Sequence, residues 1–328
     1  SQFLLLVALA LLCAVSWYIH QPRVWREHRT AAWPSFWVGT LENFGHALAD
    51  YTDALGLTGR DVSVALPVFN SHDQMAFAGE PRALAGGPAP QDIVVLHKRN
   101  FSIGWSPSRR HAIWAAYRIP HTASPQSLKR PSRFYDDPEA PNAPQHADYT
   151  KSGYDRGHLV PNHAIASRFG QEAQRETFLM SNVAPQRPWL NQGPWADIEQ
   201  RAADDWSRRY GEVWVIVGTI TATNANARKL QGGIGIPTAF YQIAVARKGE
   251  CLTACAVVMP QRISRRARPR AYLASIREIE SLSGLDFCWA LPDPEEQRLE
   301  SALPSRLWPS GLRGTIAILK RRSGIYPD

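Results

Sequence analysis

The sequence predicts an α+β domain built on a central, largely antiparallel sheet flanked by helices. Three apolar runs separated by short polar segments, 93–97, 101–105 and 112–119, indicate strands joined as hairpins. Further buried-strand patterns occur at 213–218, 240–246 and 253–259. Helical patterns stand among these runs without regular strand–helix–strand alternation, which favours an antiparallel sheet over a parallel one.

The chain opens on an apolar stretch, Phe3–Ile19, with Trp17 and Tyr18 at its end. Its length covers most of a bilayer core, and the aromatic pair is typical of a membrane interface. The stretch predicts either an N-terminal transmembrane helix or a signal-peptide core. No small-residue cleavage site precedes Pro22, which favours a membrane anchor over residues 1–22.

Residues 23–92 are expected to form a juxtamembrane helical segment and linker. Aromatic and apolar residues recur at helical spacing across 33–57, which indicates an amphipathic helix that lies near the membrane, docks on a partner, or simply packs on the core. The turn-rich segment 84–91 precedes the main domain, which we expect over 93–290.

Within the main domain, the proline-rich segment 120–151 predicts a long loop, and loops of this length in compact domains are often functional. Helices are predicted at 171–177, at 194–210 with an apolar stripe, and at 272–283 before Gly284. Residues 291–328 are charged and punctuated by proline, which predicts a C-terminal extension.

Composition favours a polyanionic partner. The 328 residues carry 37 Lys and Arg against 29 Asp and Glu, a net charge of +8. Such a balance attracts nucleic acid, although many basic proteins do not bind it. The four cysteines, at 13, 251, 255 and 288, are too few for a disulfide framework in a chain of this size, and we interpret them as structural.

Candidate site residues gather in two clusters. The first is Asp155-Arg156-Gly157-His158, which holds an acid, a cation and a base side by side. The second contains Asn191 and Glu199, which offer oxygen ligands suited to a hard divalent cation. Asn182 lies between the two clusters, and Arg133 lies in the long loop.

Each residue also has a plainer interpretation. His158 is either a general base or a buried structural histidine, and Asp155 either orients the site or forms a turn. Arg156 offers a planar fork for phosphate or a surface ion pair. Asn191 could be a helix cap, and Glu199 a partner in an ion pair within the helix. Only the complete set favours chemistry on phosphate.

Three segments together resemble the DNA/RNA non-specific endonuclease family, the endonuclease G type of ββα-metal nuclease. They are 153–162 (GYDRGHLVPN), 176–186 (ETFLMSNVAPQ) and 190–199 (LNQGPWADIE). The resemblance runs from about residue 93 to residue 289 and keeps order and spacing. It implies a ββα-metal nuclease fold for the main domain.

The resemblance also implies roles for individual residues. His158 matches the general base, Asn191 the metal ligand, and Glu199 the glutamate that holds water on the metal. Asn182 matches the site asparagine, while Arg156 and Arg133 match the phosphate-contacting arginines. Ala203 stands where some members carry a further arginine.

The resemblance implies an Mg2+-dependent enzyme, with Mn2+ as an alternative ion, that hydrolyses DNA and RNA with little sequence preference. It also implies mitochondria, with the domain in the intermembrane space, and a homodimer. Arg23, Arg26 and Arg29 after the apolar stretch favour the matrix or cytoplasmic side instead. Alternatives are a bacterial inner-membrane protein and a nuclease-like accessory subunit of a membrane complex with little or no catalysis.

Overall fold

The computed structural model describes residues 62–65, 75–122, 125, 127–222 and 227–310. Contacts divide the chain into two compact units, one of residues 1–59 with 309–328 and one of residues 60–308. The described residues belong almost wholly to the second unit. The predicted membrane segment and the predicted helix at 33–57 lie outside them, and no described helix is long and apolar enough to cross a bilayer.

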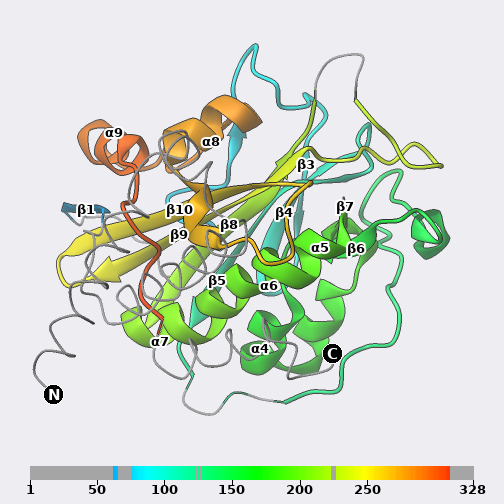
Figure 1. Ribbon diagram of the computed structural model, residues 1–328, viewed down its shortest axis with the longest axis horizontal. Coiled ribbons are helices and arrows are strands. Elements are labelled where there is room, and N and C mark those ends of the chain that lie inside the picture. Colours follow the sequence, from blue (N-terminus) through cyan, green and yellow to red (C-terminus); the bar gives the residue numbers. More distant parts are fainter. Residues whose placement is uncertain (1–61, 66–74, 123–124, 126, 223–226, 311–328) are drawn as a thin grey trace, which may run out of the picture. The chain divides into compact units, whose positions relative to one another are not determined.

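A central sheet carries this unit (Figure 1). In sheet order its strands are β1 (Val62–Ala65), β10 (Cys251–Pro260), β9 (Ala239–Lys248), β8 (Glu212–Ile220), β5 (His111–Pro120), β4 (Phe101–Ser106) and β3 (Val94–His97), with β11 (Leu273–Ala274) paired to β10. Every pairing between neighbours is antiparallel. The predicted antiparallel sheet is therefore confirmed, although β1 and β11 were not predicted.

Both faces of the sheet are buried, and β8 shows how. Val213, Val215 and Val217 point into one apolar cluster, whereas Trp214 and Ile216 point into another. Side chains alternate across a strand, so a strand covered on both faces appears in the sequence as one unbroken apolar run.

Helices cover the two faces unequally (Figure 1). One side carries α4 (Asn162–Thr177), α5 (Pro188–Leu190), α6 (Ala196–Gln200) and α7 (Ser207–Tyr210), and the other carries α8 (Ile276–Ser283) and α9 (Asp293–Ser301). The described cysteines, Cys251, Cys255 and Cys288, are free thiols.

The helix predicted at 194–210 belongs to a longer helical run, so its predicted start is wrong. The run begins at Pro188, whose fixed φ suits the first helical position. It passes through two π-helical segments, η3 (Asn191–Trp195) and η4 (Arg201–Trp206). Pro194 lies inside η3, where the wider turn accommodates the missing N–H and Gly193 leaves helical geometry.

Two other helix boundaries differ from the prediction. The pattern at 171–177 is only the second half of α4, after a break at Gly170 with φ 84°. The helix predicted at 272–283 starts later than predicted. Tyr272 is the last residue of a 3-10 turn, η5 (Pro269–Tyr272), and β11 follows it. Helix α8 starts at Ile276 because the Ser275 hydroxyl accepts a hydrogen bond from Glu278 N at 3.1 Å.

Short elements complete the unit. Strand β12 (Leu285–Asp286) pairs with β2 (Arg82–Ala83), and α9 lies within the predicted tail. In the described part of the loop at 120–151, residues His146–Tyr149 form a 3-10 turn, η1. The middle of the loop is fixed by buried Asp137, which forms an ion pair with Lys98 at 3.0 Å and accepts a hydrogen bond from Ser181 at 2.5 Å.

Candidate active site

A separate two-stranded ribbon positions the Asp-Arg-Gly-His motif. The motif is the whole of β6 (Asp155–His158), which pairs with β7 (Val183–Gln186). Neighbouring side chains on a strand point to opposite faces. Arg156 therefore extends toward the 3-10 turn η1, whereas Asp155 extends toward the helical run that carries Asn191.

His158 lies between two aromatic rings. The Phe134 and Phe178 ring centroids are each 5.0 Å from that of the imidazole. Its Nε2 atom is buried, and no hydrogen bond from another described residue reaches the ring. Burial, and then the charge of Arg130, lower the pKa of His158 to about 3. The imidazole is therefore neutral near pH 7 and able to accept a proton.

Asp155 orients Asn191. Its Oδ2 atom accepts hydrogen bonds from Asn191 Nδ2 at 2.9 Å and from Gln192 Nε2 at 3.0 Å. The two polar atoms of a carboxamide point in different directions, so this contact turns Asn191 Oδ1 away from Asp155. A carbonyl oxygen held in place by a neighbouring carboxylate suits a hard divalent cation.

Glu199 follows Asn191 on the same helical run, in α6, and is half-buried. Burial, and then the charge of Glu199, raise the pKa of the Tyr117 phenol well above its usual value. No hydrogen bond within the described part of the chain joins His158 to Asn191 or Glu199. A phosphate and its attacking water have to fit between a base and a metal ligand, so direct contact is not expected.

Arg156 is fixed against η1. Its Nη2 atom donates to His146 O at 2.6 Å, and its guanidinium carbon lies 5.7 Å from the centre of the Tyr149 ring. Burial lowers the pKa of Arg156, which nonetheless stays charged near neutral pH. The ribbon thereby holds a cation two residues from the imidazole.

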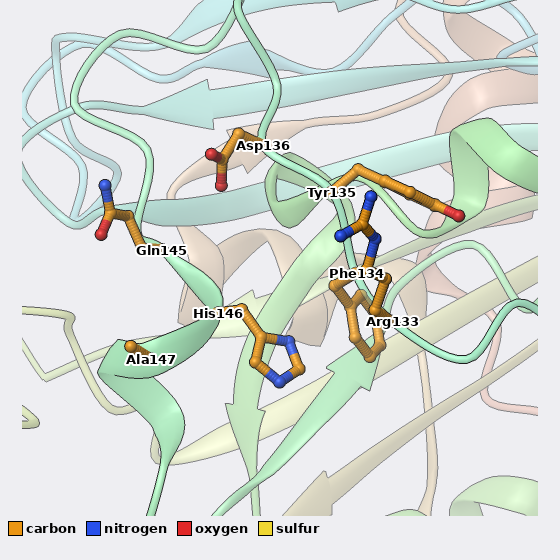
Figure 2. A pocket seen from close by; sticks show the side chains of 7 residues that line it. All are labelled: Arg133, Phe134, Tyr135, Asp136, Gln145, His146 and Ala147. Carbon is orange, nitrogen blue, oxygen red and sulfur yellow. The ribbon is translucent and has the colours of Figure 1, made fainter.

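Arg133 lines a pocket of about 510 Å3. Figure 2 shows residues 133–135 on one wall and residues 145–147 on the other, with Asp136 above them. Arg133 is exposed, and its guanidinium carbon lies 5.4 Å from the centre of the Tyr135 ring. The pocket adjoins the site, since Phe134 contacts His158 and His146 contacts Arg156.

Asn182 lies behind the site rather than in it. Its side chain is fully buried, its Oδ1 atom accepts from Val160 N, and its Nδ2 atom donates to Val160 O and Thr177 O, all at 2.9 Å. These bonds fix the backbone just after His158. The structure therefore gives Asn182 a positioning role.

Sequence reasoning did not single out three neighbours of the motif: Phe134, Phe178 and Gln186. Gln186 is fully buried with neither amide atom hydrogen-bonded, and a methyl group on Gly157 would lie 2.4 Å from its Oε1. Its place at the end of the 176–186 motif was the available signal. Ala203 is buried in the core, so no cation occupies that position.

A cluster of three carboxylates lies in the same unit, away from the candidate active site. Glu280, Asp286 and Glu300 place carboxylate oxygens within 4.8 Å of one another, between α8, β12 and α9. Arg277 Nη2 lies 2.9 Å from Glu300 Oε2. Burial, and then the charge of Glu280, raise the pKa of Glu300 to about 8. This group is built from different elements from those that carry Asn191.

The fold and the site define a mixed helix-and-sheet protein whose Asp-Arg-Gly-His ribbon faces an asparagine-bearing helix. The sequence profile of the DNA/RNA non-specific endonuclease family matches residues 80–294. The chain belongs to that family, and it is accordingly a nucleic-acid phosphodiester hydrolase.

Individual relatives are similar over the same region. The chain is 30% identical over 204 residues to mitochondrial endonuclease G of Homo sapiens, an alignment that spans 58% of this chain and 68% of that protein. It is 29% identical over 223 residues to mitochondrial endonuclease G of Bos taurus, spanning 64% and 74%. It is 28% identical over 213 residues to nuclease C1 of Cunninghamella echinulata var. echinulata, spanning 58% and 81%.

A crystal structure of an EndoG/EndoGI complex has a similar fold. The TM-score is 0.53 at 22% identity, over 61% of this chain and 88% of that chain. At this identity the likeness concerns the fold.

Proposed function

We propose that this protein is a divalent-metal-dependent endonuclease that hydrolyses DNA and RNA with His158 as general base. The observation that carries the proposal is the Asp155–Asn191 hydrogen bond. It links the ribbon that bears the imidazole to the helix that bears the metal-ligand candidate. Base and ligand thereby have a fixed relation although they are far apart in sequence.

His158 takes the proton from the attacking water. Its low pKa keeps the imidazole unprotonated over the physiological range. Asn182 supports it by fixing the backbone at Val160. Phe134 and Phe178 pack against the imidazole and limit the space in which it can turn.

Asn191 and Glu199 are the residues that would hold the metal, Mg2+ or, as an alternative, Mn2+. Oxygen donors in small number suit Mg2+, which keeps several waters of its own. When bound, the ion stabilises the negative charge that develops on the phosphate and on the leaving oxygen. Asp155 contributes by holding the Asn191 carboxamide.

Arg156 and Arg133 bind and neutralise the phosphate backbone. Arg156 shares strand β6 with His158, and Arg133 precedes Phe134, whose ring lies against the imidazole. None of these groups needs a base edge or a sugar hydroxyl. We therefore expect cleavage of both DNA and RNA with little sequence preference.

The cellular setting is proposed from the relatives and from the N-terminus. The endonuclease G relatives are named as mitochondrial, and we place this protein in mitochondria. We further propose that residues 3–19 anchor it in the inner membrane and that it forms a homodimer. The family resemblance favours the intermembrane space for the main domain, whereas the arginines after the anchor favour the matrix. A bacterial inner membrane is the alternative location.

The function is tested by incubating plasmid DNA and single-stranded RNA with the protein in Mg2+ or in EDTA. We expect nicking of both substrates in Mg2+ alone. His158→Ala should abolish cleavage, whereas His97→Ala, which alters an exposed histidine on β3, should leave it unchanged. A folded protein that cleaves neither substrate would favour the accessory-subunit alternative.

A further inference from the structure

A run of arginines follows β10 and lies beside the candidate metal ligand. The segment 261–270, here termed the arginine loop, contains Arg262, Arg265, Arg266, Arg268 and Arg270. No Asp or Glu occurs between Glu250 and Glu278, so no carboxylate within the segment or close to it in sequence offsets this charge.

Three of these side chains are available to a partner. Arg262, Arg265 and Arg266 are exposed, and among the residues that the structure describes none forms an ion pair or a hydrogen bond with their guanidinium groups. The Ser264 hydroxyl accepts a hydrogen bond from Arg266 N, which leaves that side chain available. Three like charges close together in the sequence repel one another. An arrangement of this kind suits a polyanion that supplies the missing negative charge.

The loop is fixed to the ribbon at its start. Gln261 Nε2 donates to Pro185 O at 2.5 Å, and Gln261 Oε1 accepts from Arg187 N at 2.9 Å. Pro185 is the residue of β7 that pairs with Arg156. The loop therefore leaves the sheet next to the strand pair that carries the candidate catalytic motif.

The loop then passes the segment that carries Asn191. A methyl group on Gly193 would lie 2.8 Å from Arg265 O, so the two backbones are in close contact. Figure 1 shows the segment after β10 passing beside α5. The arginine loop thus passes beside the helical run that carries Asn191, with Arg265 against Gly193, and it is a different segment from the one that forms the Arg133 pocket.

We propose that the arginine loop binds the phosphate backbone of the nucleic acid beside the scissile phosphate, through Arg262, Arg265 and Arg266. The proposal rests on the proposed function and extends its contacts from one phosphate to a stretch of backbone. The guanidinium groups bind phosphate without reading bases, so DNA and RNA are both ligands. The loop contributes to substrate binding and not to proton transfer.

The test measures binding apart from cleavage. Fluorescence anisotropy of a labelled DNA duplex and of a labelled RNA strand is followed in EDTA over a range of salt concentrations, for the full chain and for R262A/R265A/R266A. Each phosphate contact contributes about 0.9 to the slope of log affinity against log salt in duplex DNA. We expect the variant's slope to fall by about two to three and its affinity at 100 mM salt to fall by roughly tenfold or more.

A matched control removes the same charge elsewhere. K248A/R209A/R298A replaces three exposed cations, one at the end of β9, one on α7 and one on α9. It should change affinity by less than about threefold if position rather than net charge matters. A lysine version of the loop, R262K/R265K/R266K, should keep most of the salt slope because each lysine still neutralises a phosphate.

The outcomes separate the loop from the enzyme activity. Equal losses in the loop variant and the control, or no loss in either, would overturn the proposal. Binding that depends on the loop in a protein that does not cleave would support the loop and reject the nuclease. In an active protein, KM should rise at least tenfold in the loop variant while kcat stays within about twofold.

Discussion

Asn191 Nδ2 donates a hydrogen bond to Asp155 Oδ2 across 2.9 Å, and 36 positions of sequence separate the two residues. The bond fixes the carboxamide so that its oxygen points away from Asp155. Asp155 therefore acts on a metal indirectly, by orienting the side chain that would hold it.

The first prediction concerns this bond. Asp155→Ala should raise the Mg2+ concentration needed for half-maximal cleavage by about 10- to 100-fold, because outer partners of metal ligands contribute that much to affinity. Asp293→Ala, on an exposed residue of α9, is the control. An unchanged Mg2+ requirement in Asp155→Ala would show that Asp155 does not orient a metal ligand.

The second prediction is the pH dependence of cleavage. With a pKa of about 3, His158 stays neutral down to strongly acidic solution, so the acid limb of kcat/KM should lie well below pH 6. Arg130→Ala should move that limb upward, because removing a nearby cation makes protonation easier. An acid limb near pH 6.5 that Arg130→Ala does not move would contradict the lowered pKa of His158.

The same pKa has a consequence for stability. The folded-state pKa of His158 lies below its unfolded value of about 6.5, so the unfolded chain binds the extra proton between pH 3 and 6.5. His158 therefore favours the folded state less and less as pH falls through that window, and its contribution is constant above it. Denaturant unfolding of wild type and of His158→Ala at pH 5 and pH 7.5 measures this contribution. The free energy of unfolding of wild type minus that of the variant should be smaller at pH 5 than at pH 7.5.

The third prediction concerns the close packing of Gly157 on Gln186. Gly157→Ala should cost about 1–3 kcal/mol of unfolding free energy, since the new methyl group would overlap the Gln186 side chain. In a Gln186→Gly background, which removes both the Oε1 and the Cβ atoms that the new methyl group would overlap, the same change should cost much less. A double-mutant cycle by thermal unfolding reports the coupling, and additive effects would contradict the contact.

The fourth prediction concerns Glu300. Its folded-state pKa of about 8 exceeds the unfolded value of about 4.5. Between these two pH values the folded protein holds a proton that the unfolded chain has lost. The free energy of unfolding therefore falls as pH rises through that window. Glu300→Gln should therefore raise the melting temperature at pH 8 and change it little at pH 5.

The exposed residue Glu250 provides the comparison for that measurement. Glu250→Gln should have no effect at either pH, because its carboxylate stays in water. A Glu300→Gln effect that is equal at pH 5 and pH 8 would mean that Glu300 is ionised in the folded protein.

The strands of the sheet were predictable because β5, β8, β9 and β10 are long apolar runs buried on both faces. The ribbon was not, since β6 is four polar or small residues whose pairing with β7 is set by contacts with the rest of the fold. Predicted helix boundaries were wrong where a proline or a capping side chain, and not the apolar pattern, set the first residue of the helix. Pro188 started one helix early, and the Ser275 cap started another late.

The identities of the site residues were predictable from the motif, but their contacts were not. The hydrogen bonds of Asn182 to Val160 and Thr177 depend on where the chain turns after β6 and α4. The phenylalanines around His158 come from the long loop and from the end of α4, and no spacing brings them together. The sequence shows the positive charge of the arginine loop but not its position beside the site. That position depends on the hydrogen bonds of Gln261 and on the close contact with Gly193.

The central claim is that His158 accepts the proton of the attacking water. The most direct measurement is chemical rescue: single-turnover cleavage of plasmid DNA in Mg2+ by His158→Gly, with and without added imidazole, beside Asn191→Ala. Loss of a general base lowers the rate by about 10²- to 10⁴-fold, and we predict that imidazole restores a substantial part of it in His158→Gly alone. A variant that binds DNA and Mg2+ normally but stays inactive at every imidazole concentration would contradict the claim, as would full activity without imidazole.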